Sequence, residues 1–79
     1  PYAERISNLH TAHLIAHSFM KKNFSHHLSE KKRGDIANDA KVSFFESDNG
    51  DRIVKIKIIS KELTREIILS GILNDDGSI

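Results

Sequence analysis

The chain lacks cysteine and tryptophan, and it contains one proline, one methionine, one tyrosine and four phenylalanines. Without cysteine it can form no disulfide scaffold, no thiolate metal site and no cysteine nucleophile. No uninterrupted apolar run approaches the roughly 18 residues that cross a bilayer, and no charged segment followed by an apolar one opens the chain. We therefore expect a soluble cytoplasmic protein with no membrane partner.

The net charge is only +1, because the chain contains 12 Lys and Arg residues and 11 Asp and Glu residues. What the sequence does contain, 38% hydrophobic and 29% charged residues, is typical of a folded domain. Its 79 residues form one small domain, which hides only about 60% of the surface of its unfolded chain. We predict an α+β fold with a helical part over 1–40, a three-stranded antiparallel β-meander over 41–73 and a tail over 74–79.

The helical part is predicted to contain a long helix over 3–22, which has no glycine or proline. At 100° per residue, its main apolar side chains fall on one broad face. This face is formed by Leu9, Ala12, Ala16, Phe19 and Met20.

A second, shorter helix is predicted over 26–33, with Ser25 as its N-cap and Gly34 just past its end. Segment 35–40 then reads as a linker, or as a single helical turn anchored by Ile36.

The β part opens with two strands, over 42–46 and 52–59, joined by a turn that contains Asn49-Gly50. Asn-Gly between apolar runs is a strong hairpin signal, because both residues tolerate a positive φ. Side chains alternate along the second strand, with valine and isoleucine on one side and lysine on the other. The apolar side is formed by Val54, Ile56 and Ile58, and the lysine side carries Lys55 and Lys57.

The segment 65–73 is open to two interpretations. As a strand it is a short apolar run rich in β-branched residues. As a C-terminal helix its apolar side chains would surround the whole cylinder, which a small surface helix cannot bury. We favour the strand and keep the helix as the alternative, because Ser60 could open a helix.

The apolar side chains of the β part exceed what one long helix can cover. Ile53 and Ile59 lie on the lysine side of the second strand, beside Lys55 and Lys57. Because Phe44 and Phe45 are adjacent, one should enter the core and the other should point outward. We therefore expect a small non-enzymatic binding or regulatory protein without a cofactor. It would contact another protein or a second copy of itself through Ile53, Lys55, Lys57 and Ile59.

The alternative function is nucleic-acid binding through the one local block of basic residues. Its cations are Lys21, Lys22, Lys31, Lys32 and Arg33. Such side chains neutralise backbone phosphates. The block carries no Asn or Gln for base edges, so phosphate contact is favoured over sequence reading.

Three histidines, His10, His13 and His17, fall within an arc of about 60° on the long helix. Neutral imidazoles at this spacing can share a metal ion, and unperturbed histidines also titrate near pH 6.5, typical of a pH switch. One helix supplies three ligands awkwardly. We favour the interpretation that these residues flank the core and hydrogen-bond to backbone or water.

A second alternative concerns catalysis. An N-terminal proline is a secondary amine that can act as a general base, and Pro1 resembles that residue in tautomerases of the oxalocrotonate type. The resemblance covers Pro1 alone, because 2–8 reads as helix and no matching arginine pattern is present. No spacing of Ser, His and Asp marks a nucleophile elbow or a triad.

Overall fold

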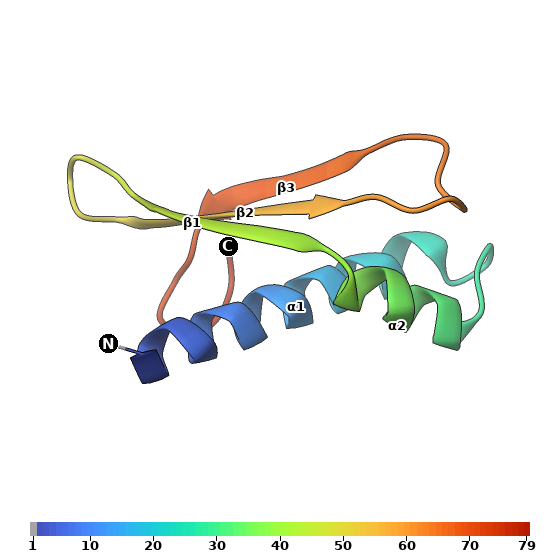
Figure 1. Cartoon of the computed structure of the whole chain (residues 1–79), viewed down its shortest axis with the longest axis horizontal. Helices are drawn as coiled ribbons and strands as arrows, with labels where there is room; N and C mark the ends of the chain where they lie inside the picture. Colours follow the sequence, from blue (N-terminus) through green and yellow to red (C-terminus); the bar gives the residue numbers. More distant parts are fainter. Residues whose placement is uncertain (1) are drawn as a thin grey trace.

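The computed structural model describes the backbone of residues 2–79 and the side chains of residues 8–79. Two helices form one layer and a three-stranded antiparallel sheet forms the other (Figure 1). The helices precede the strands along the chain, so the predicted α+β architecture is confirmed. None of the helices within residues 2–79 combines the length and the apolar character that a membrane span requires.

Helix α1 spans Tyr2–Phe24 and confirms the predicted long helix. Ala12, Ala16 and Met20, four residues apart, are completely buried. Small alanine side chains let the helix lie close to the sheet, so this face forms the helical half of the core. Leu9 was predicted on the same face but is exposed.

The exposure of Leu9 follows from the length of the second helix. Helix α2 packs beside α1 and ends at Asn38, and its last turn hydrogen-bonds to His13 and His17 of α1. The part of α1 that precedes these contacts therefore has no second helix beside it.

Helix α2 spans Glu30–Asn38, so the prediction of a helix over 26–33 was wrong. Ser29, not Ser25, is the N-cap, and its Oγ accepts a hydrogen bond from the backbone N–H of Lys32 at 3.2 Å. Gly34 lies inside the helix rather than after it.

Burial explains this choice of boundaries. A helix over 26–33 would bury only Leu28, whereas the observed helix brings Ile36 and Ala37 into the core. Gly34 in a helix interior costs about 1 kcal/mol relative to alanine. Complete burial of an isoleucine side chain contributes about 1.5–3 kcal/mol and outweighs that cost. Most of segment 35–40 is therefore helical, so the linker interpretation was wrong and the structure favours its alternative, a helix anchored by Ile36.

The sheet has the order β1-β2-β3, with β1 spanning Lys41–Glu46, β2 Arg52–Ile58 and β3 Ile67–Ile72. Segment 65–73 thus contains a strand, and the helical alternative was wrong because β3 pairs along the length of β2. The predicted hairpin is present between β1 and β2. In its turn, Gly50 has a φ of 88°, which glycine adopts without strain.

One face of the sheet, here called the inner face, packs on the helices. Its centre is formed by Val54, Ile56 and Ile58 of β2, which are all completely buried. Phe44 belongs to this face by register but is 37% exposed, so the expectation that one of the two adjacent phenylalanines enters the core was wrong. It lies on the edge strand β1, where it pairs with Val54 of β2.

The C-terminal segment 74–79 folds back between the sheet and α1 (Figure 1). The backbone N–H of Asn74 donates to the carbonyl of Ser78 at 2.8 Å and closes a turn. Gly71 has no side chain on the inner face, and Ile79 lies against it. A Cβ added to Gly71 would be 3.4 Å from the Cβ of Ile79. This tail therefore covers the end of the inner face that α2 does not reach.

Candidate functional site

The face of the sheet turned away from the helices is the candidate site, and we call it the outer face. The cross-strand register places alternate residues of all three strands on it. Its members are Lys41, Ser43, Phe45, Ile53, Lys55, Lys57, Ile68, Ser70 and Ile72. Both helices described within residues 2–79 lie on the opposite side of the sheet (Figure 1).

Three apolar side chains lie side by side at one end of the outer face. Phe45 of β1 pairs with Ile53 of β2, and Ile53 pairs with Ile72 of β3. Phe45 is 55% exposed and Ile72 is 49% exposed, while Ile53 between them is half-buried. We call these residues the apolar row, and about half of the surface of its two outer members is in contact with water.

Lysine side chains follow the apolar row along β2. Lys55 lies between Ser43 and Ser70, and it forms no ion pair with any residue whose side chain is described. Lys57 forms one, because its Nζ lies 2.7 Å from Oε1 of Glu66. The outer face therefore combines apolar surface with a lysine charge available to a carboxylate.

The four residues predicted for partner binding fall together only in part. Ile53, Lys55 and Lys57 lie on the outer face, while exposed Ile59 follows the last residue of β2. Phe45, Ile68 and Ile72 also belong to this face, and Ile68 is exposed. Phe45 is the outward member of the phenylalanine pair, whereas the two isoleucines of β3 were not predicted as site residues.

The five basic residues predicted for nucleic-acid binding lie in different environments. Lys21 and Arg33 line one hollow between the helices, together with Glu30. Arg33 donates from Nη1 to the carbonyl of Leu28 at 2.7 Å. Lys22 and Lys31 are exposed.

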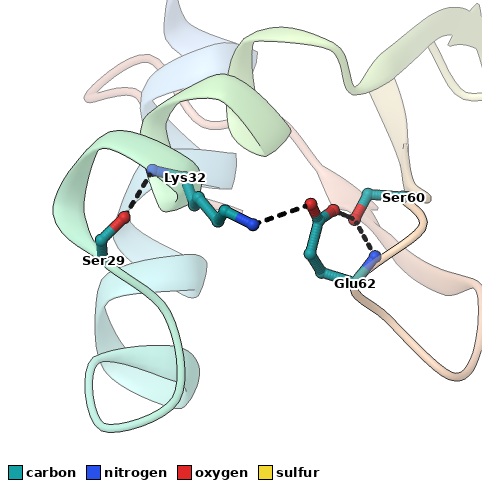
Figure 2. A network of polar contacts seen from close by, with 4 residues as sticks. All are labelled: Ser29, Lys32, Ser60 and Glu62. Atoms are coloured by element: carbon teal, nitrogen blue, oxygen red, sulfur yellow. Dashed lines mark hydrogen bonds and ion pairs between the residues drawn. The ribbon is translucent and has the colours of Figure 1, made fainter.

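Lys32 instead belongs to a polar network that joins α2 to the loop between β2 and β3 (Figure 2). Its Nζ lies 3.2 Å from Oε1 of Glu62. The Ser60 hydroxyl donates to Oε2 of Glu62 at 2.9 Å, and it accepts from the Glu62 backbone N–H at 3.1 Å. The hydroxyl of Ser60 lowers the pKa of Glu62, with smaller contributions from the Glu62 backbone N–H and from Lys32.

The histidines divide between two environments. His13 donates from Nδ1 to the carbonyl of Ala37 at 3.1 Å, and His17 donates from Nε2 to Oδ1 of Asn38 at 2.7 Å. His10 is exposed. Two of the three therefore fasten α1 to the last turn of α2. No group of three or more metal-ligating side chains assembles among the described residues.

Pro1, the residue on which the tautomerase alternative depends, lies outside the described residues. Comparison of the chain with protein families, with curated proteins and with solved structures finds no match.

Proposed function

We propose that this protein is a small non-enzymatic binding module that recognises another protein through its outer face. The observation that carries the proposal is the apolar row, in which Phe45 and Ile72 are exposed. The row lies near Lys55, which has no ion pair among residues 8–79, on a face that neither of the described helices covers. A partner that buries the row removes apolar surface from water, which favours association.

The chemistry of the outer face specifies the partner. Lys55 lies at the centre of the face, and Lys41 lies at the end opposite the apolar row. Neither forms an ion pair within the part of the chain whose side chains are described. A partner with apolar side chains flanked by carboxylates complements this arrangement, whereas a basic partner would be repelled.

The free energy available from burying the apolar row indicates how large the contact with the partner has to be. Complete burial of an isoleucine or phenylalanine contributes about 1.5–3 kcal/mol, and roughly half of that gain is already realised within this chain. The apolar row alone thus supplies about 3 kcal/mol, which is less than the 4–15 kcal/mol cost of association. Recognition therefore needs the lysines and a second area of contact as well.

The experiment that tests the proposal begins with photo-crosslinking. A benzoylphenylalanine replaces Phe45, and a control replaces Leu14, which is exposed on α1. The crosslinked protein is identified, purified and titrated with this chain. We expect Phe45→Ala and Lys55→Glu each to weaken binding by about tenfold or more.

The matched control is Lys31→Glu, which makes the same charge change at an exposed position of α2. It should leave the affinity unchanged. Equal losses for Lys55→Glu and Lys31→Glu would contradict the proposal. A ligand that depends on Lys31 alone, with affinity falling steeply with salt, would support the nucleic-acid alternative instead.

A further inference from the structure

The free edge of β3 offers backbone groups to a further strand. The Leu73 N–H donates to the Arg52 carbonyl at 2.8 Å, so this pair is hydrogen-bonded across β2 and β3. In an antiparallel ladder, alternate residues direct their backbone groups to opposite sides of the strand. The backbone N–H and C=O groups of Ile68, Ser70 and Ile72 therefore point away from the sheet.

The two edges of the sheet differ in how well they are protected against further pairing. Strand β1 begins with Lys41 and ends with Glu46, and charged residues discourage the addition of a strand. Strand β3, with the sequence IILSGI, carries neither a charge nor a proline, and its pairing with β2 continues through all six residues without a bulge. An apolar, regular edge of this kind is an acceptor for another strand.

We propose that the β3 edge pairs with the β3 edge of a second copy of this chain. The two strands would run antiparallel about a two-fold axis at Ser70, so that Ser70 faces Ser70 and Ile68 faces Ile72. Both isoleucines are exposed in the single chain, and each would gain an apolar cross-strand neighbour. In the same register Leu69 faces Gly71, so a large side chain lies opposite the smallest one.

Charges at the two ends of β3 favour the same partner. The loop before β3 holds Lys61 and Arg65, which form no ion pair within the part of the chain whose side chains are described. The same loop also holds Glu62 and Glu66, which pair with Lys32 and Lys57. The segment after β3 holds Asp75, which pairs with Arg52 at 2.8 Å, and Asp76. An antiparallel pair brings the start of one β3 beside the end of the other, so the cations of one copy lie toward the segment that carries Asp76 of its partner.

Edge pairing would also enlarge the outer face. Three strands from each copy would form one continuous sheet. In the proposed register, Ile68 of the second copy extends the apolar row beyond Ile72. This inference uses the edge of the sheet rather than its face, and therefore goes beyond the proposed function.

The test is the oligomeric state, measured by sedimentation equilibrium over a range of concentrations. We expect a concentration-dependent dimer of the full chain. Ser70→Lys places two lysines opposite each other at the two-fold axis and should raise the dissociation constant by about tenfold or more. Its matched control is Ser43→Lys, at an exposed serine in the same cross-strand row but on β1. The control should dimerise like the natural chain.

A charge-swap experiment makes the test specific. Ser70→Lys and Ser70→Glu should each be mainly monomeric alone, and mixing them should restore a dimer. Amide hydrogen exchange should show protection at Ile68, Ser70 and Ile72 that grows with concentration. A monomer at every concentration would overturn the proposal, as would a dimer that Ser43→Lys weakens as much as Ser70→Lys. A monomer that still binds a partner through Phe45 would refute the edge pairing and leave the outer-face proposal intact.

Discussion

The two faces of the sheet show what one strand does with alternating residues. Ile56 points to the inner face and is completely buried between the helices and the flanking strands. Ile53 belongs to the same strand and points to the outer face, where it is only half-buried. The same side-chain chemistry therefore serves folding on one face and remains available for binding on the other. The position of a residue in the two-residue period of the strand decides which of the two roles its side chain has. Substitutions on the two faces test this assignment.

The largest expected effect belongs to the inner face. Ile56→Ala removes a completely buried side chain from the middle of β2. It should lower the free energy of unfolding by about 2–5 kcal/mol, because it loses buried apolar surface and leaves a cavity. Urea denaturation followed by circular dichroism measures the change.

The matched control is Ile53→Ala, which makes the same chemical change on the outer face. It should lower the free energy of unfolding by less than about 1 kcal/mol, a typical effect of a substitution away from the core. Similar losses at both positions would mean that the outer face supports the fold of the single chain, and would contradict our assignment of the two faces.

A smaller effect is expected where the two helices meet. His13 Nδ1 donates to the Ala37 carbonyl, so His13→Ala should lower the free energy of unfolding by about 0.5–1.5 kcal/mol. Ala37 O also accepts the backbone N–H of Ala40 at 3.3 Å and keeps a partner in the variant. His10→Ala, at an exposed position, should change nothing measurable. A larger loss for His10→Ala than for His13→Ala would contradict this structural role.

The difference between the two faces could be predicted in part from the sequence. The two-residue period over 52–59 correctly identified the buried side of β2, because alternation is a local property. The boundaries of α2 could not be predicted in the same way, since Ser25 and Ser29 are both suitable N-caps. The burial of Ile36 in the assembled core decided between them.

The arrangement of the candidate site could likewise be predicted from local sequence only in part. The Asn49-Gly50 turn is close enough in sequence to bring Phe45 beside Ile53, and that pairing could have been predicted from the hairpin. The pairing of Ile72 with Ile53 could not, because the loop between β2 and β3 has no comparable turn signal to set the register. Similarly, nothing local indicates that Ile79 returns to fill the space above Gly71.

The smallest effect should come from the exposed network that ties α2 to the loop after β2 (Figure 2). The Ser60 hydroxyl, the Glu62 backbone N–H and Lys32 lower the pKa of Glu62, in that order. Because the folded-state pKa of Glu62 lies below the unfolded one, the carboxylate stabilises the fold at pH values above its ordinary pKa. That stability is lost as the pH falls through the folded-state pKa. The midpoints of urea denaturation of the natural chain and of Glu62→Gln should therefore differ at pH 7 and converge on acidification. The other carboxyl groups are present in both proteins, so their contributions cancel when the two midpoints are subtracted. A difference that grows as the pH falls would show that Glu62 does not stabilise the fold as a carboxylate.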